Sequence, residues 1–564
     1  MGWAMNQPRP RTAADAFVAT LRDAGVRHLF GLPGSTEASL LDALARDGQL
    51  RYVMALHESA AVGMADGYAR ATGRPAVVSL HTSVGVMNGM GHTYNAWRDQ
   101  SPVVVTAGHK DRDVLAQDGF CALPDLPGLL ASFTKWTWQS LSASAVASDL
   151  RRALHVASVP PRGPVFLAIP EDMLGEPVTT GTPAPSHPEA DGHADASLAR
   201  RPDAAAVRLA AIRLLQARAP VLLLGNDVAP AGPDAVALAE ALAVPVLVSD
   251  PTELAVLPFP TGHPHYLGVY GGEPAVLDGC DVLAAIGGRV FFPFSGPRAP
   301  QLPAGATLIH VHPDPRQVGW SVRPSVGMAA DAGPTLRDLA AAAASLGGLD
   351  PAARTAREAR VASLRHARRA RLAQERDARW DAVPISVPRV MTEIGRVLPK
   401  GTVVVDEAVR STNVALSHLP LPSEAAWHHT GGGALGWGVP VSIGMRLAQP
   451  ERAVVALVGD GAFHFSAQAL WTAAREGVSV VTVVLDNGGY LAVKRAIEGF
   501  VGAPAQLGAY PGTIISHLDH CAVARGYGAR ATLVMRPDEL APAIEAAMAS
   551  TGPAVVVVRV EEVR

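Results

Sequence analysis

The sequence predicts an α/β protein built from three doubly wound domains with parallel sheets. Ten short apolar runs rich in Val, Ile and Leu recur along the 564 residues, and segments of helical period such as DAVALAEALAV and SAQALWTAAREG lie between them. Continuous β-branched runs that alternate with helices are typical of parallel strands buried on both faces. The 54 glycines and 46 prolines supply the many tight turns that alternating units need.

The ten runs predict strands at 75–81, 102–108, 164–170, 220–225, 244–250, 281–288, 401–407, 452–461, 478–487 and 553–560. Two stretches interrupt this rhythm. Residues 176–203 are rich in Pro, His, Gly and Asp, which predicts a linker. Residues 346–384 carry an arginine-laden helical stretch, whose interspersed Glu and Asp favour a solvated connecting helix over a nucleic-acid patch. The breaks predict an N-terminal domain over 10–180, a middle domain over 200–345 and a C-terminal domain over 385–564.

Composition excludes several classes of protein. Hydrophobic residues make up 48% of the chain and charged residues 18%, so a sizeable core is available. The net charge of −3 gives no footprint for nucleic acid or an anionic membrane. Three cysteines without a CxxC pair predict neither a disulfide framework nor a zinc ribbon. The start, MGWAMNQPRPRTAADAF, lacks the apolar run of a signal peptide, and no stretch is apolar enough to cross a membrane, so we expect a cytoplasmic protein.

The segment VALVGDGAFHFSAQALWTAAREGVSVVTVVLDNGGY at 455–490 carries the strongest local signal. One strand ends in Gly459-Asp460-Gly461, and the next ends in Asp486-Asn487 followed by two glycines. The carboxyl ends of parallel strands bind ligands in open α/β sheets. An oxygen-only pair such as Asp460 and Asn487, with a backbone carbonyl, suits Mg²⁺ or Ca²⁺. The alternative is that both segments are ordinary strand-to-helix turns.

This segment resembles the cofactor motif of the thiamine-diphosphate-dependent superfamily of decarboxylases and acetolactate synthases, in which an asparagine follows GDG at this spacing. The resemblance implies that Asp460, Asn487 and the carbonyl of Gly489 bind the Mg²⁺ that anchors the diphosphate, in the turn that contains Gly459 and Gly461. One departure is that the family usually has Asn-Asn where this chain has Asp486-Asn487. The ligand is the second residue of the pair, so the site is expected to survive, with an extra carboxylate that can alter metal affinity.

A second segment, MALHESAAVGMADGYARATG at 54–73, contains a lone glutamate, Glu58, at the start of a predicted helix among small apolar residues. On chemistry alone Glu58 is either a favourable charge at a helix N-terminus or a functional carboxylate in an apolar environment. The segment is similar to the one that carries the superfamily's essential glutamate. The resemblance implies that Glu58 hydrogen-bonds the aminopyrimidine ring and promotes loss of the thiazolium C2 proton. It also implies that Glu58 and the diphosphate site come from different subunits, so we expect a homo-oligomer, as a dimer or a dimer of dimers.

Several segments resemble the benzoylformate decarboxylase branch along most of the chain, namely FGLPGST, ALHESAAVGMADGYA, SLHTSVGVMNGMGHTYNAW, SPVVVTAG, HHTGGGALGWGVPVSIGMRLAQPERAVVALVGDG, ALWTAA and DNGGYLAVKR. The resemblance implies that Leu435 supports the bent cofactor and that the carbonyl of Gly433 faces its 4′-amino group. A dinucleotide fingerprint is the alternative for GGGALGWG. That segment lacks the GxGxxG spacing and follows no clear strand.

The same resemblance places Ser35 and His81 against the substrate, with Tyr490 and Ala492 in the same pocket. Ser35 would hold the carboxylate of a 2-oxo acid, and His81 would donate or relay protons. Without the resemblance, Ser35 would be interpreted as a helix N-cap, and His81 as a strand-end histidine bonded to backbone.

Two departures from the branch bear on its chemistry. The middle-domain loop GGRVFFPFSGP at 287–297 has Phe294 at or near the position of a second active-site histidine, which in the family donates a proton after CO₂ leaves. The absence of this histidine would favour carboligation. The possible substitutes are His92, His428 and His429, although a structural role suits each of them better. In the diphosphate cradle EAVR at 407–410, Arg410 either pairs with phosphate or faces solvent or a subunit interface.

We therefore expect an enzyme that uses thiamine diphosphate and Mg²⁺ to decarboxylate a 2-oxo acid with an aromatic or bulky apolar substituent, without oxidation. Two alternatives stay open. The first is a carboligase or lyase of the acetolactate synthase or 2-hydroxyacyl-CoA lyase kind, acting with an aldehyde or acyl acceptor. The second is a catalytically idle cofactor-binding subunit. FAD is not expected, because nothing in 200–345 signals it. No nucleic acid or membrane partner is expected.

Overall fold

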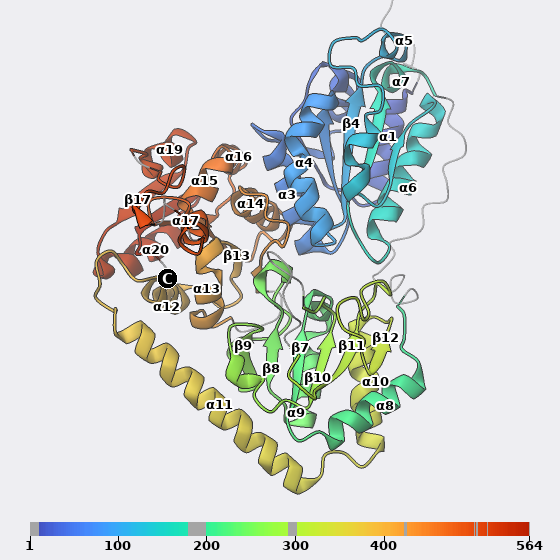
Figure 1. Ribbon diagram of the computed structural model, residues 1–564. Coiled ribbons are helices and arrows are strands. Elements are labelled where there is room, and N and C mark those ends of the chain that lie inside the picture. Colours follow the sequence, from blue (N-terminus) through green and yellow to red (C-terminus); the bar gives the residue numbers. More distant parts are fainter. Residues whose placement is uncertain are drawn as a thin grey trace, which may run out of the picture.

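Three parallel sheets, each covered by helices, make up the computed structural model (Figure 1). It describes residues 11–178, 199–291, 302–421, 426–500, 502, 506–515 and 517–562. Each sheet has six strands, and every strand pairing within the sheets is parallel. The predicted α/β fold class is confirmed. All ten apolar runs contain strands, because their side chains are buried on both faces of a sheet.

The first sheet has the strand order β2-β1-β3-β4-β6-β5. Its strands are β1 His28–Gly31, β2 Arg51–Met54, β3 Ala76–His81, β4 Val103–His109, β5 Thr137–Gln139 and β6 Val165–Pro170. The helices of this domain are α1 Ala13–Asp23, α2 Ala38–Asp47, α3 Glu58–Thr72, α4 Thr82–Arg98, α5 Arg112–Leu115, α6 Val146–Ser158 and α7 Glu171–Gly175. From β1 the chain goes to β2 on one side of β1. It then crosses back to β3 on the other side of β1. The carboxyl ends of β1 and β3 therefore form a topological switch point, where such sheets bind ligands.

The second sheet has the order β12-β11-β10-β7-β8-β9. Its strands are β7 Pro220–Leu224, β8 Val246–Val248, β9 Tyr266–Val269, β10 Val282–Ile286, β11 Thr307–Val311 and β12 Val326–Met328, with helices α8 Ala204–Gln216, α9 Gly232–Leu242 and α10 Ala332–Ser345. The long helix α11, Pro351–Asp377, leads from this domain to the third (Figure 1). Only Arg357 and Val361 of this helix are buried, and its other residues are exposed or half-buried. Of the predicted linker at 176–203, residues 179–198 lie outside the described residues.

The third sheet repeats the pattern of the first, with the order β14-β13-β15-β16-β18-β17. Its strands are β13 Val403–Glu407, β14 Trp427–His428, β15 Val454–Gly459, β16 Val481–Asp486, β17 Arg530–Val534 and β18 Ala554–Arg559. Its helices are α12 Val387–Val397, α13 Thr412–His418, α14 Gly438–Ala448, α15 Asp460–Ser466, α16 Ala469–Glu476, α17 Leu491–Glu498, α19 His520–Gly526 and α20 Leu540–Met548. Its switch point lies between the carboxyl ends of β13 and β15. Among the described residues, no helix has the length and apolarity needed to span a bilayer.

Helices α3 and α14 join the first and third domains through a close crossing (Figure 1). A Cβ atom on Gly67 would overlap the carbonyl oxygen of Val441, and one on Gly444 would overlap that of Met64. Both positions therefore require glycine for the two helix backbones to meet. The small residues of α3 therefore serve a purpose of their own, which is to let this helix pack closely against α14.

Arg70 of α3 ties all three domains together in the core. Its guanidinium donates to Asp66 at 2.8 Å and to Asp99 at 2.6 Å, and also to the carbonyl of His429 in the third domain at 3.0 Å. A longer bond of 3.4 Å reaches the carbonyl of Ala255 in the second domain. Although burial opposes the charge, the two carboxylates hold the pKa of Arg70 above its ordinary value.

Arg70→Met should destabilise the whole chain, because it leaves Asp66 and Asp99 buried without a counter-charge. Removing one partner of a buried pair costs about 3–5 kcal/mol. Thermal and urea denaturation of the purified variant should reveal the loss. Arg22→Met is the matched control, since Arg22 pairs with Asp47 at the surface and its removal should cost less than about 1 kcal/mol. Equal effects of the two variants would contradict a central role for Arg70.

Candidate active site

Asp460 and Asn487 lie at the carboxyl ends of the neighbouring strands β15 and β16. Asp460 opens α15 and is 2% exposed. Its Oδ1 accepts the amide of Gly461 at 2.8 Å, and its Oδ2 accepts the amide of Gly488 at 2.9 Å, so the carboxylate directly contacts the loop that carries Asn487. Burial, with a contribution from Asp486, raises the pKa of Asp460 to about 6. A buried carboxylate in this state is a group that a cation would stabilise.

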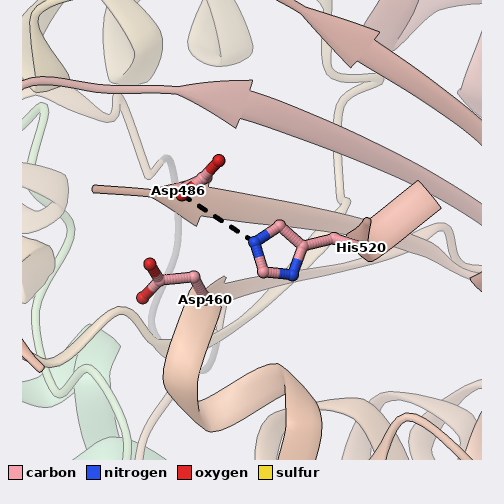
Figure 2. A group of neighbouring side chains, drawn as sticks. All are labelled: Asp460, Asp486 and His520. Carbon is pink, nitrogen blue, oxygen red and sulfur yellow. Dashed lines mark ion pairs between the residues drawn. The ribbon is translucent and has the colours of Figure 1, made fainter. Parts of the chain in front are cut away.

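Asp486 is the residue that departs from the family pattern. Neighbours from distant parts of the chain compensate its negative charge. Arg559 donates to both of its carboxylate oxygens at 2.9 Å. His520 Nε2 lies 3.8 Å from Oδ1, as the dashed line in Figure 2 shows, and His520 Nδ1 is 2.8 Å from His464 Nε2. Burial opposes ionisation of Asp486, but the nearby His520 and the hydrogen-bonded Arg559 lower its pKa to about 2. Asp460, Asp486 and His520 offer ligand atoms within 4.8 Å of one another (Figure 2).

Glu58 is the first residue of α3, as expected, and is buried. Its Oε2 accepts a hydrogen bond from the side-chain amide of Asn88 on α4 at 3.0 Å. On the other side, a Cβ atom on Gly85 would lie 3.2 Å from Oε1, which is a tight contact, so the glycine leaves more room for that oxygen. The helix N-terminus favours a negative charge at Glu58.

Ser35 and His81 lie on neighbouring segments at the switch point of the first sheet. Ser35 is exposed and starts the 3₁₀ helix η1, Ser35–Glu37, which follows β1. His81 ends β3, and its Nδ1 lies 3.0 Å from Thr36 Oγ1 and 3.2 Å from Glu37 Oε2. The ring is bonded to side chains rather than to backbone. The two substrate residues suggested by the sequence are therefore brought to one place.

The loop with Gly433 and Leu435 is held by α4. Asn95 bonds both the amide and the carbonyl of Ala434, and His92 Nε2 lies 3.3 Å from the carbonyl of Leu435. His92 Nδ1 is 2.6 Å from the carbonyl of Ser59, and burial lowers the pKa of His92. Both ring nitrogens of this histidine thus face backbone carbonyls, which is a structural role.

The other expected residues occupy varied positions. His429 Nδ1 lies 2.6 Å from the carbonyl of Asp406, and His428 is buried in β14. Tyr490 packs its ring against Gly461, where a Cβ atom would overlap it. Ala492 on α17 and Arg410 in the 3₁₀ helix η8, Val409–Ser411, are exposed. Phe294 lies outside the described residues.

Several residues of the site were not anticipated from the sequence. Glu37 and Asn88 contact the expected residues His81 and Glu58, while His520 and Arg559 contact Asp486. Asn88 lies within the segment SLHTSVGVMNGMGHTYNAW, whereas His520 and Arg559 belong to no recognisable local motif. Glu37 also had a local signal, since it lies two positions after Ser35 in a turn that follows a strand. Within the described part of the chain, no hydrogen bond links Glu58 to Asp460 or Asn487.

Comparisons with known proteins identify the family of the chain. Three family models match the chain: the N-terminal thiamine pyrophosphate (TPP) binding domain of thiamine pyrophosphate enzymes over residues 11–127, their central domain over 207–339 and their C-terminal TPP binding domain over 410–558. Thiamine pyrophosphate is the same compound as thiamine diphosphate.

Individual relatives extend the match to most of the chain. Benzoylformate decarboxylase of Pseudomonas aeruginosa is 34% identical over 480 residues, 84% of each chain. A probable acetolactate synthase large subunit of Methanocaldococcus jannaschii is 27% identical, over 96% of this chain and 90% of its own. The solved thiamine diphosphate-dependent 4-hydroxybenzoylformate decarboxylase of Rhodococcus jostii has a TM-score of 0.82 and 28% identity, over 98% of this chain and 99% of its own. The chain therefore belongs to the thiamine pyrophosphate enzymes, as a decarboxylase or a related C–C lyase or ligase.

Proposed function

We propose that the enzyme decarboxylates a 2-oxo acid with an aromatic or bulky apolar substituent, without oxidation, using thiamine diphosphate and Mg²⁺. The observation that carries this proposal is the contact of His81, through Thr36 and Glu37, with the turn that contains Ser35 at the first switch point. A hydroxyl and an imidazole suit binding of a carboxylate and transfer of a proton. The named activities of the two decarboxylase relatives support an aromatic substrate.

The residues of the third domain fit the cofactor's charged end. A buried carboxylate, an amide oxygen and the Gly489 carbonyl, which follow adjacent strand ends, would form an oxygen donor set of the kind that Mg²⁺ prefers. Asp460, Asn487 and Gly489 would hold the metal and, through it, the diphosphate. When bound, thiamine diphosphate supplies the nucleophile and the electron sink for loss of CO₂.

The chain's own groups would then orient the reactants and move protons. Glu58, held by Asn88, would exchange a proton with the cofactor's ring. Ser35 would bind the substrate carboxylate through its exposed hydroxyl, and His81 would deliver a proton to the product carbon. The Gly433–Leu435 loop, fixed by His92 and Asn95, would support the cofactor between these groups.

Carboligation is the second candidate, and two observations favour it. The segment GGRVFFPFSGP contains no histidine where the decarboxylase branch has its second proton donor. The substitutes considered above include His92 and His429, and both have a ring nitrogen bonded to a backbone carbonyl. A slow final protonation would leave time for an aldehyde acceptor to react. An idle subunit is disfavoured, because Glu58, Asp460 and Asn487 are all present.

We also propose that the active unit is a homodimer, within a dimer of dimers, whose site is shared between two copies. Glu58 belongs to the first domain and Asp460 to the third, and large apolar side chains are exposed beside both. They are Val84 and Met87 on α4, and Phe465 and Val493 on α15 and α17. A second copy that covered them would bring its Glu58 to this chain's Asp460.

Asp460→Ala should lower the retention of thiamine diphosphate by more than about 100-fold, because it removes the only charged residue of the proposed metal-binding set. Isothermal titration with the cofactor and Mg²⁺ measures this loss. Asp486→Asn is the matched control. Its charge is already compensated by Arg559, so affinity should change by less than about tenfold. Tight cofactor binding by the Asp460 variant would refute the metal assignment.

Glu58→Gln should bind cofactor yet lose about 10²–10⁴-fold in turnover, since an amide cannot exchange the proton. Mixing it with Asp460→Ala subunits should restore part of the activity, because one of the two mixed sites then contains both intact residues. Activity assays after subunit exchange, verified by mass spectrometry of differently labelled chains, provide the measurement. No recovery after complete exchange would argue against a shared site.

A panel of 2-oxo acids, with and without an aldehyde, tests the reaction itself. Benzoylformate and 4-hydroxybenzoylformate should react at least about tenfold faster than pyruvate, because a larger apolar substituent buries more surface. CO₂ release and mass spectrometry of the products measure decarboxylation and ligation together. A product dominated by 2-hydroxy ketone would move the assignment to the carboligase alternative. No CO₂ from any acid would exclude decarboxylation.

A further inference from the structure

Glu37 is a buried carboxylate on which four hydrogen-bond donors converge. It is 2% exposed. Oε1 accepts the amide of Gly108 at 2.9 Å and the hydroxyl of Thr36 at 2.7 Å. Oε2 accepts the amide of Gly34 at 2.9 Å and lies 3.2 Å from His81 Nδ1. An acceptor with two oxygens satisfies all four donors, whereas a glutamine would turn its own amide protons towards some of them.

The surrounding backbone is shaped to admit this contact. A Cβ atom on Gly108 would overlap Glu37 Oε1, and one on Gly34 would overlap the ring of His81. Both glycines lie at the carboxyl edge of the first sheet, Gly108 near the end of β4 and Gly34 in the turn after β1. A buried charge is costly unless hydrogen bonds compensate it. The four bonds therefore make Glu37 a fixed point of the site.

The same contacts decide which nitrogen of His81 carries its proton. The Thr36 hydroxyl gives its hydrogen to Glu37, so it can only accept from His81 Nδ1 at 3.0 Å. The second neighbour of Nδ1 is the carboxylate, which also accepts. Nδ1 must therefore carry a hydrogen. In the described part of the chain Nε2 of His81 has no hydrogen-bond partner, so Nε2 is the nitrogen left to exchange protons.

We infer that Glu37 is a positioning residue, which fixes the Nδ1–H tautomer and ring orientation of His81 so that Nε2 serves as the acid–base atom. The inference rests on the proposed role of His81 in proton transfer. Through the Gly34 amide, Glu37 also fixes the turn that presents Ser35. One carboxylate thus sets the geometry of both substrate residues. A purely structural anchor for the turn is the competing explanation, and a double-mutant cycle separates the two.

The experiment uses the holoenzyme with Glu37→Gln, His81→Ala and the double variant, and measures kcat and KM for the best 2-oxo acid of the panel. Glu37→Gln should lower kcat by about 10–100-fold, as losses of orienting partners do. In the His81→Ala background the same change should cost less than about threefold, because no ring is left to orient. Equal losses in both backgrounds would overturn the inference and leave Glu37 as a structural anchor.

Two further variants guard the result. Thr36→Val removes only the hydroxyl between His81 and Glu37. If Glu37→Gln does not fold, Thr36→Val should still lose kcat in the parent and not in His81→Ala, and equal losses would again refute the inference. Glu393→Gln is the matched control, since Glu393 is buried and paired with Arg389 and Arg396 on α12. It should lower the melting temperature without lowering kcat.

Failure of the proposed function is distinguishable from failure of this inference. If the parent releases CO₂ from no 2-oxo acid, the proposed function falls. The melting temperatures of the parent, Glu37→Gln, His81→Ala and the double variant then test whether Glu37 and His81 interact. Bonding between Glu37 and His81 predicts that the double variant loses less than the sum of the single losses. Additive losses would overturn the inference.

Discussion

Buried carboxylates that accept backbone amides at the carboxyl ends of parallel strands are the interaction on which the site depends. Glu37 accepts two such amides beside β1, Asp460 accepts two after β15, and Glu407 at the end of β13 accepts those of Gly436, Trp437 and Gly438. Each charge would be costly in the core without these bonds. In return each carboxylate fixes the loop whose amides it binds.

Glu407 in the third domain also influences the position of a helix in the first domain. Its three bonds hold the start of α14, and α14 crosses α3 through Gly67 and Gly444. Helix α3 begins with Glu58, so the end of β13 also influences the placement of this glutamate in the first domain. Burial is severe enough to raise the pKa of Glu407 to about 7 despite the three amides. The burial of Glu407 thus has two effects: it brings the carboxylate to the amides that fix the start of α14, and it raises the pKa of that carboxylate.

The sequence predicts the buried parts of the fold well and the long-range parts of the site poorly. Interior strands such as β15 and β16 are continuous apolar runs, whereas the two-residue β14 and the exposed β17 have no such pattern. Asp460 and Asn487 follow strands directly, so their proximity can be predicted. Arg559 lies 73 positions after Asp486 and meets it only because β16 and β18 pair in register. No local motif encodes that contact.

The histidines of the site differ in what their bonds leave free, and this difference bears on the reaction. His92 has a carbonyl on each ring nitrogen, and His429 has one at 2.6 Å from Nδ1. His81 is bonded through Nδ1 alone within the described part of the chain. A general acid must present a nitrogen to the substrate, and His81 and His429 each keep Nε2 without a hydrogen-bond partner among the described residues; we propose His81 because it contacts the turn that contains Ser35. Since the segment 287–297 contains no histidine, the rate at which His81 delivers its proton would set the balance between aldehyde release and ligation.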